Sequence, residues 1–318
     1  MILFTADWHL KLGQKNVPIE WACARYKMFF EQIQELESDC DMHIIGGDLF
    51  DRIPSMDELT LYFDFISGIT IPTYIYDGNH EATRKNNTFF TNLKKATKEI
   101  NHLVEIIDVS TVIDDFAILP YADLHKKGSI EKLSKMASVL FTHVRGEIPP
   151  HVVPEVKLER FKDFDIVFAG DLHSHSNTQL NIVYPGSPMT TQFHRTTVKT
   201  GYILIDMTDW AWEWHEFNLP QLIRKTVTDP DAMIPTTYNH TIYELEGDVA
   251  DLSGVKNSEL LDKKVVKRKT EATLLLDNDM SIEEELAEYL SYILELKDET
   301  VKQIIGIFHD HSKEARVG

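Results

Sequence analysis

Short apolar runs, each closed by an acidic or glycine-containing turn, recur along the first two thirds of the chain. The runs are rich in β-branched residues and predict strands over seven segments: Met1–Ala6, Met42–Ile45, Thr73–Tyr76, Ala117–Leu119, Val139–Thr142, Ile166–Ala169 and Gly201–Ile205. Between them, apolar residues spaced three to four positions apart predict helices over Glu20–Glu37, Asp57–Gly68, Asn86–Lys98 and Ile130–Met136. This alternation predicts a layered α/β core whose functional loops follow the carboxyl ends of the strands.

The pattern changes near Leu219–Pro220. Beyond this point lie two strand candidates, His240–Leu245 and Glu271–Leu276, and a helical end that a capping box of Ser281 with Glu284 opens. We therefore expect one domain over residues 1–220 and a small α/β domain with terminal helices over residues 221–318.

Two apolar patterns leave alternatives open. Trp210, Trp212 and Trp214 alternate with other residues at the period of a half-buried strand, so they either pack against a facing sheet or form a base-stacking platform. Apolar residues at helical spacing in the last 40 positions either pack on their own domain or dock a partner.

The composition argues against a membrane-spanning, secreted or disulfide-rich protein. The chain has 318 residues, 43% of them hydrophobic, which is ample for a large core, and no apolar run reaches the length of a membrane span. The N-terminal segment lacks a basic region and Asp7 interrupts it, so we expect a strand there and no secretion signal. With only Cys23 and Cys40 there is no disulfide framework, and a reducing, cytoplasmic setting is expected.

The net charge of −19 argues against a broad basic surface for nucleic acid. Bound cations or an electropositive partner would reconcile that charge with a DNA substrate. One local basic cluster is either a DNA contact or a solvated strand: Lys263, Lys264, Lys267, Arg268 and Lys269.

Five polar clusters each directly follow an apolar run. They are Asp7-Trp8-His9, Gly47-Asp48-Leu49-Phe50-Asp51-Arg52, Gly78-Asn79-His80-Glu81, His143 and Gly170-Asp171-Leu172-His173. Since the carboxyl ends of strands in a parallel sheet share one edge, we expect the clusters to converge there. Carboxylate, imidazole and amide groups favour Mn, Fe, Zn or Mg, and Asp48 can bridge two such ions. Each cluster alone is a weak indication, but together they predict a two-metal site.

In this order and spacing the clusters resemble the motif blocks DxH, GDxxD, GNH[DE], H and GHxH of the calcineurin-like metallophosphoesterase superfamily. The resemblance spans about residues 1–206 and implies a two-sheet layered core. It implies one metal held by Asp7, His9, Asp48 and His173, and a second held by Asp48, Asn79, His143 and Asp171. Asp48 and His80 would be the catalytic residues, with His80 assisting the leaving group.

Asp171 departs from the family pattern, which usually has His at this position. Aspartate is itself a good ligand for Mn or Mg, so a site remains chemically reasonable. A shifted register would instead pair His173 with His175. We favour Asp171 with His173, because Gly170 follows its apolar strand as the family's glycine does.

Two further segments resemble the SbcD-type DNA nuclease subunits of bacteria and phages: Phe141-Thr142-His143-Val144 with Gly146, and Tyr184-Pro185-Gly186-Ser187-Pro188. This resemblance implies Mn-dependent (or Mg-dependent) cleavage of DNA in end processing, recombination or replication, a C-terminal capping domain and a homodimer. The chain has no GxxxxGK[ST] loop, so ATP dependence would need a separate SbcC-like coiled-coil ATPase. Candidate contacts to the DNA backbone are Arg52, Arg84, Arg145, Lys267 and Arg268.

Two other functions compete with this hypothesis. The first is a phosphatase or nucleotide phosphodiesterase of the same superfamily. The second and third clusters also resemble protein serine/threonine phosphatases, although Ile53 stands where those enzymes have Gly and Tyr76-Asp77 where they have Arg-Gly. The second competing function is a non-catalytic scaffold subunit whose metal site is degenerate at Asp171.

Overall fold

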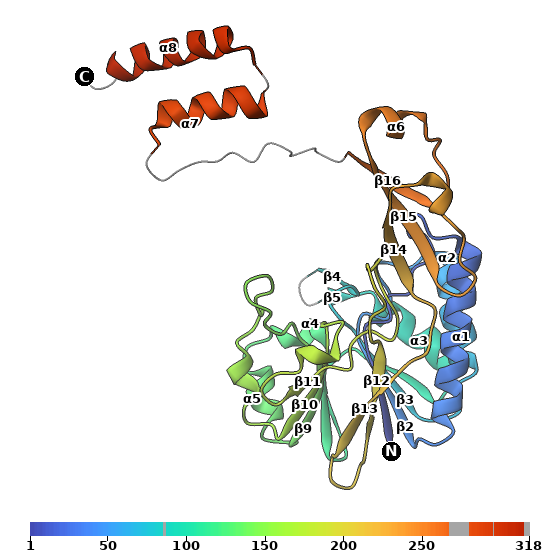
Figure 1. The fold of residues 1–318 in the computed structure, drawn as a ribbon. Coiled ribbons are helices and arrows are strands. Elements are labelled where there is room, and N and C mark those ends of the chain that lie inside the picture. Colours follow the sequence, from blue (N-terminus) through green and yellow to red (C-terminus); the bar gives the residue numbers. More distant parts are fainter. Residues whose placement is uncertain (85–86, 267–279, 295, 315–318) are drawn as a thin grey trace. The chain divides into compact units, whose positions relative to one another are not determined.

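Two mainly parallel sheets form the centre of the structure, a computed structural model that describes residues 1–84, 87–266, 280–294 and 296–314 (Figure 1). The six-stranded sheet has the order β13 (Trp212–Glu216), β12 (Gly201–Ile205), β1 (Ile2–Thr5), β2 (Met42–Gly46), β3 (Thr73–Tyr76) and β6 (Val104–Ile107). The five-stranded sheet has the order β11 (Ile182–Val183), β10 (Ile166–Gly170), β9 (Val139–His143), β8 (Phe116–Leu119) and β7 (Thr111–Ile113). Strands β1, β2, β3 and β6 are parallel to one another, as are β8 to β11.

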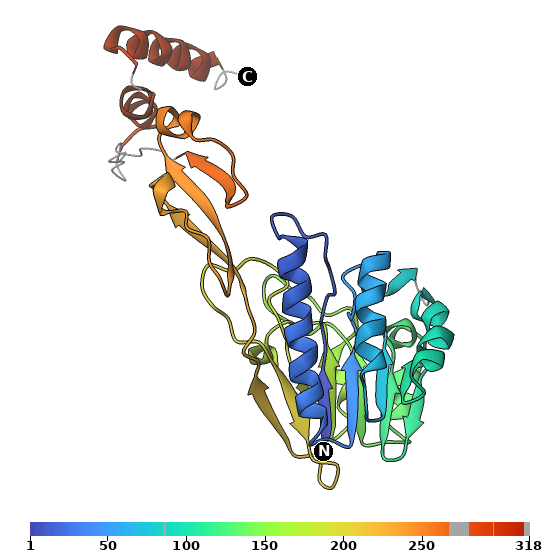
Figure 2. The same cartoon turned by 90° about the vertical axis from the view of Figure 1, so that its right-hand side faces the viewer.

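Helices cover the outer face of each sheet, which gives four layers (Figures 1 and 2). The six-stranded sheet packs against α1 (Ile19–Glu37), α2 (Met56–Ser67) and α3 (Phe90–Ile100), and the five-stranded sheet against α4 (Tyr121–Leu124), α5 (Ser129–Leu133) and a 3-10 turn at Leu158–Phe161. A third apolar cluster, with Phe4, Phe141 and Phe168 at its centre, fills the space between the sheets. Because both faces of the central strands are buried, these strands consist of continuous apolar runs.

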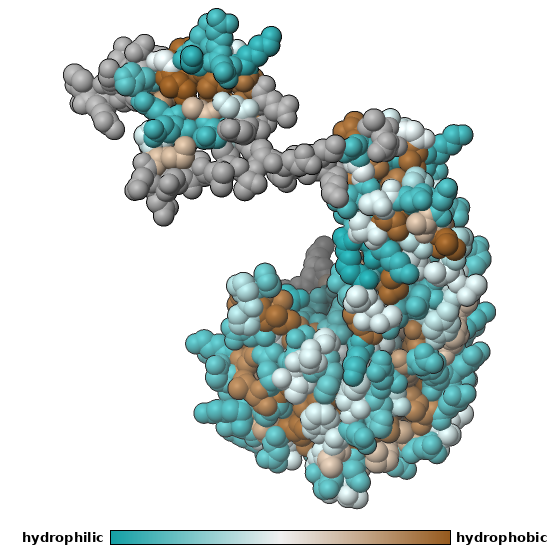
Figure 3. Space-filling view, viewed as in Figure 1, coloured by the Kyte–Doolittle hydropathy of each residue, from teal (hydrophilic) through white to brown (hydrophobic). Residues whose placement is uncertain are grey.

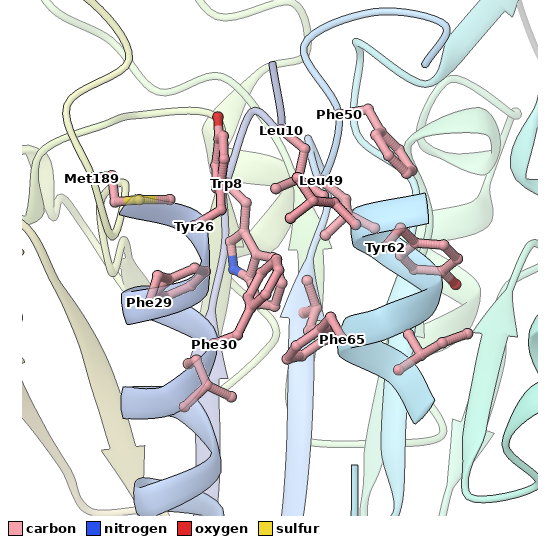
Figure 4. Close-up of a cluster of buried hydrophobic side chains, with 14 of the residues drawn as sticks. Trp8, Leu10, Tyr26, Phe29, Phe30, Leu49, Phe50, Tyr62, Phe65 and Met189 are labelled. Carbon is pink, nitrogen blue, oxygen red and sulfur yellow. The ribbon is translucent and has the colours of Figure 1, made fainter. Parts of the chain in front are cut away.

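Trp8 sits in an aromatic cluster between α1 and α2 (Figure 4). Its ring meets Phe29 at 4.7 Å and Phe65 at 4.9 Å, both edge-on, and its indole N–H donates to the Thr5 hydroxyl at 3.0 Å. The helix α2 begins in a capping box in which Ser55 and Glu58 satisfy each other's backbone N–H groups. The core thus fixes the orientation of Trp8, which stands between Asp7 and His9 in the sequence.

A third, three-stranded sheet consists of β14 (Leu222–Val227), β15 (His240–Gly247) and β16 (Leu261–Val266). Along the sequence, α6 (Val249–Gly254) connects β15 to β16. The helices α7 (Ile282–Glu288) and α8 (Asp298–Glu314) follow β16 in the described part of the chain. The contacts divide the chain into two compact units, residues 1–245 with 256–263, and residues 246–255 with 264–318. The sheet begins just after the expected boundary at residue 220, but most of it groups with the first unit. The domain boundary therefore stays a prediction.

The seven strands and four helices expected in the first 206 residues are all present, with ends that differ by a few residues. The capping box of Ser281 and Glu284 is confirmed, whereas Glu271–Leu276 lies outside the described residues. Of the tryptophan stripe, Trp210 and Trp214 pack against the cluster between the sheets and Trp212 is 36% exposed. None of the helices in the described part of the chain combines the length and apolar character that a bilayer crossing needs.

Replacing Phe65 with alanine should lower the free energy of unfolding by about 3–5 kcal/mol, because the removal of this buried aromatic ring leaves a cavity between α1 and α2. Chemical denaturation followed by tryptophan fluorescence measures the change. The control is Met56→Ala on the same helix, whose side chain is 76% exposed. Equal, small effects in both variants would contradict the assignment of this cluster as core.

Candidate metal centre

The five polar clusters do converge, but from two sheets. The first three follow β1, β2 and β3 of the six-stranded sheet, and the last two follow β9 and β10 of the five-stranded sheet. The expectation that one sheet edge gathers all five is therefore wrong. The carboxyl ends of both sheets meet instead, as shown by the backbone N–H of Asp171, which donates to the Asp7 carboxylate at 3.0 Å.

The backbone at these strand ends is unusual. Asp7, His9, Asp48 and Asp171 have φ values of 57°, 47°, 48° and 104°, a region that residues other than glycine rarely adopt. Such conformations persist only where the surrounding structure holds them, and they concentrate at functional sites. Four of the seven predicted metal ligands are therefore held in strained conformations.

One half of the centre is formed by Asp7, His9 and His173. Their ligand atoms lie within 4.8 Å of one another, and the Nε2 atoms of the two histidines are 3.0 Å apart. The Nδ1 of His173 lies 3.1 Å from the Thr191 hydroxyl, a contact that orients the ring with Nε2 toward His9. Two imidazole nitrogens that face each other beside a buried carboxylate are a donor set that suits a divalent cation.

The other half is gathered around His143. Its Nε2 lies 3.0 Å from Asn79 Oδ1, 3.4 Å from Asp48 Oδ2 and 3.9 Å from Asp171 Oδ1. The Nδ1 donates to the Gly46 carbonyl at 2.9 Å, which leaves Nε2 as the ring nitrogen that would bind an ion. A cation between these acceptors would remove their mutual repulsion, and the residues present fit a second metal ion.

Burial and charge act in opposite directions on these groups. Burial raises the pKa of Asp7, a fully buried carboxyl, well above its ordinary value. Burial also raises the pKa of Asp48, but the positive charges of His143 and His9 outweigh it and hold that pKa below the usual range. Burial lowers the pKa of His143, yet the Asp48 charge, with others, raises it well above the ordinary value. Without an ion, protons on Asp7 and His143 therefore offset the charge of the buried carboxylates, and a bound cation would replace those protons.

Residues outside the predicted ligand set brace the centre, and sequence reasoning gave them no role. Glu81 is fully buried, and its carboxylate accepts the backbone N–H groups of Asp48, Phe50 and Gly78 at 3.0, 2.9 and 2.8 Å. It thereby ties the loop after β2 to the loop after β3. The only indication of this structural role in the sequence was the position of Glu81 inside the third polar cluster.

The turn at residues 184–187 braces the opposite side. The Ser187 hydroxyl lies between two carbonyls to which it can donate, that of Asp7 at 2.7 Å and that of Met189 at 2.6 Å, and the Ser187 N–H donates to the His173 carbonyl at 3.2 Å. Gly186 has a φ of 77°, and a side chain there would meet the backbone of residues 173 and 175 at about 3 Å, so the turn needs glycine. This turn couples Asp7 to the segment that carries His173.

Asp171 forms an ion pair with Arg145, a partner that a neutral histidine at this position would not need. Both of its carboxylate oxygens face the Arg145 guanidinium, at 3.2 Å from Nε and 3.2 Å from Nη2. The pair leaves this corner of the centre with no net charge, as a neutral histidine would. The alternative residue, His175, points elsewhere: its Nδ1 lies 2.7 Å from the Tyr184 carbonyl and its ring stacks on Trp214.

His80 lies at the open side of the centre, with 35% of its side chain exposed. Its Nδ1 is 2.6 Å from the Asp51 carbonyl and its Nε2 is 3.8 Å from Asp48 Oδ2, while its backbone N–H donates to Asp48 Oδ1 at 2.9 Å. This place suits a group that passes a proton to a leaving oxygen. His80 also forms a possible ligand group with His9 and Asp48, so metal binding is a second role that the geometry permits.

Two of the candidate DNA contacts have their side chains described, and both are engaged in ion pairs. Arg52 pairs with Glu58 at 3.1 Å, and Arg145 pairs with Asp171. The side chain of Arg84, and all of Lys267 and Arg268, lie outside the described residues. Contacts of these five residues with DNA stay predictions.

Comparison with known proteins identifies the family. Residues 1–175 match the family described as calcineurin-like phosphoesterase. The chain is 39% identical over 316 residues to a protein of Escherichia phage T5 named "Probable exonuclease subunit 1", covering 96% of each chain. It is 27% identical over 207 residues to a protein of Invertebrate iridescent virus 6 named as phosphoesterase 244L, covering 58% of this chain and 69% of the other. The crystal structure of TT1561 of Thermus thermophilus matches with a TM-score of 0.43 and 11% identity, over 68% of this chain and 97% of that one.

Replacing Asp48 with asparagine should reduce manganese binding from two ions to at most one, because the carboxylate next to both halves of the centre is lost. The affinity should fall by at least about 100-fold, since losing an outer residue that only supports a ligand already costs about 10–100-fold. Isothermal titration with Mn²⁺ measures both values. Asp64→Asn, an exposed change on α2, is the control. Two tightly bound ions in Asp48→Asn would refute this role.

Replacing Arg145 with alanine should strengthen manganese binding roughly tenfold, about 1.4 kcal/mol, because a positive charge disappears and both Asp171 oxygens become available. The matched control is Arg160→Ala, which removes a similar two-bond pair with Glu131 on the surface. The same titration measures the effect. Weaker binding in Arg145→Ala alone would show that the guanidinium orients Asp171 for the ion.

Proposed function

The chain belongs to the calcineurin-like phosphoesterase family, and on this basis we propose that it is a metal-dependent nuclease that hydrolyses phosphodiester bonds of DNA. The observation that carries the proposal is the likeness to the phage T5 protein named as an exonuclease subunit, which extends over 96% of both chains. The buried centre of carboxylates and imidazoles supports the same chemistry from the structure itself. Manganese is the proposed metal, with magnesium as the other choice that oxygen ligands suit.

Two divalent cations, when bound, would polarise phosphate oxygens and lower the pKa of water. Asp7, His9, Asp48 and His173 would hold one of them, and Asp48, Asn79, His143 and Asp171 the other. Asp48 lies between the halves: its Oδ2 is 3.7 Å from His9 Nε2 and 3.4 Å from His143 Nε2. Glu81 keeps Asp48 in place through the backbone, so the bridging carboxylate needs no reorganisation when substrate binds.

With both ring nitrogens protonated, His80 would give its Nε2 proton to the departing oxygen and keep its Nδ1 proton. The Asp51 carbonyl at Nδ1 can only accept a hydrogen bond, so it orients the ring and keeps a proton on Nδ1. The Nε2 atom then faces the centre at its exposed side, where a leaving strand could depart. A positioned general acid contributes about 10²–10⁴ to the rate.

We also propose an SbcC-like coiled-coil ATPase as partner, together with a role in DNA end processing, recombination or replication. Its support in the structure is the helical end of the chain, where apolar side chains are exposed on α7 and α8 (Figure 3). Ile282 on α7 is 71% exposed and Ile307 on α8 61%, whereas Leu290 and Val301, which belong to the helical pattern, are buried. Exposed apolar residues on a helix can dock on a partner. A homodimer is part of this proposal as well.

A non-catalytic subunit is the second candidate function. The observation that favours it is the Arg145 guanidinium, which engages both oxygens of Asp171 and so competes with a metal for this ligand. The two functions differ in two measurable properties, because a scaffold would bind fewer than two manganese ions and would stay inactive with its partner present.

The protein should release nucleotides from DNA in the presence of Mn²⁺ and show little turnover of phosphopeptides or mononucleotide esters. Digestion of end-labelled duplex and single-stranded DNA, resolved on denaturing gels, measures the activity. Asp48→Asn is the inactive control. Turnover of the small esters without any digestion of DNA would exclude the nuclease and favour a phosphatase or nucleotide phosphodiesterase.

His80→Ala should keep two manganese ions while the rate of DNA hydrolysis falls by about 10²–10⁴. Parallel measurements of metal content and rate separate the two effects. His102→Ala, a change of an exposed histidine away from the centre, should leave both unchanged. Loss of metal in His80→Ala would assign His80 to the ligands, next to His9 and Asp48.

A further inference from the structure

A cavity of about 830 Å³ adjoins the metal centre and shares His173 with it as part of its wall. His173 presents Nε2 to His9 in the centre, while its Nδ1 lies 3.1 Å from the Thr191 hydroxyl, which also lines the cavity. A molecule in the cavity would therefore touch an imidazole that belongs to the centre. The volume lies in the range of small-molecule binding sites, about 300–1,000 Å³.

One part of the cavity wall is aromatic. The rings of His175 and Trp214 stack with centroids 5.3 Å apart and an angle of 18° between their planes. Both rings are anchored, because His175 Nδ1 lies 2.7 Å from the Tyr184 carbonyl and the Trp214 indole N–H donates to the Pro185 carbonyl at 2.9 Å. Anchored aromatic rings bind flat heteroaromatic groups without losing rotamer entropy.

Other parts of the wall are polar. Exposed Gln192 and Lys199 line the cavity together with Thr191. The amide can hydrogen-bond the edge of a base, and the ammonium can pair with a phosphate. Aromatic, amide and cationic groups around one cavity match the three parts of a nucleotide, its base, its polar edges and its phosphate.

We propose that this cavity binds one nucleoside unit of the substrate strand, with its base against His175 and Trp214 and the scissile phosphate at the metal centre. The inference rests on the proposed nuclease function and specifies where the substrate lies. His175 is then a binding residue and not a metal ligand. Its contact with the base is sequence-tolerant, because every base presents an aromatic face.

Binding of deoxyadenosine monophosphate to the Mn²⁺-loaded protein, measured by isothermal titration, tests the proposal with inorganic phosphate as the reference probe. The nucleotide should bind about tenfold or more tightly than phosphate. In His175→Ala its affinity should fall about tenfold, the loss expected for one stacked base, while phosphate binding stays unchanged. Unchanged phosphate binding shows that His173 and the metals are still in place.

The matched control is His215→Ala. His215 stacks on Tyr202 with centroids 5.4 Å apart at 21°, much as His175 stacks on Trp214, but it does not line the cavity. Its loss should leave nucleotide binding unchanged. As a second variant, Gln192→Trp places a large ring in the cavity from an exposed position, where folding is not at risk, and should also weaken nucleotide binding alone.

The proposal is overturned if the nucleotide binds no more tightly than phosphate, or if neither His175→Ala nor Gln192→Trp weakens it. A phosphoserine peptide that binds more tightly than the nucleotide also overturns it. Digestion of DNA by the same wild-type preparation is scored separately. Absence of digestion rejects the nuclease function, whereas digestion with unaltered nucleotide binding in both variants rejects only this cavity as the nucleoside site.

Discussion

Carboxylates buried side by side are the constraint on which this structure depends. Asp7 and Asp48 are 0% and 2% exposed, and Asp171 lies next to them. Removing an isolated carboxylate from water costs several kcal/mol even after relaxation, and neighbouring like charges add to that cost. Such a group of residues is stable only with protons or cations among them. The imidazoles of His143 and His173, each oriented by a hydrogen bond through its Nδ1, turn Nε2 toward the carboxylates and complete the ligands of a cation site.

The rest of the fold keeps these groups together against their repulsion. The apolar cluster between the two sheets holds β1 and β2 against β9 and β10, and the strained backbone at Asp7 and Asp48 is maintained by that packing. Glu81 joins two loops of one sheet through three backbone hydrogen bonds, and Ser187 joins Asp7 to the segment of the other sheet that carries His173. The site is therefore preorganised by core packing and by backbone hydrogen bonds, and not by contacts among the ligands alone.

Much of this could be predicted from the sequence, for definite physical reasons. Buried parallel strands must be apolar on both faces, so β1, β2, β9 and β10 are visible as continuous apolar runs, and the polar residues directly after them stand out. The half-polar β14, Leu222–Val227, carries no such pattern and was missed. The division of the motifs between two sheets, the pairing of Arg145 with Asp171 and the contacts of Glu81 depend on residues far apart in the chain, and no local pattern encodes them. Ligand roles inferred from spacing remain predictions, although the geometry brings all seven residues together.

The proposed function requires these side chains to share a pair of divalent ions. Anomalous diffraction from crystals grown with manganese would locate the ions. Two peaks roughly 3.5–4 Å apart are expected, one beside Asp7, His9 and His173, the other beside Asn79 and His143, with Asp48 in contact with both. A single peak, or manganese bound away from these residues, would contradict the account.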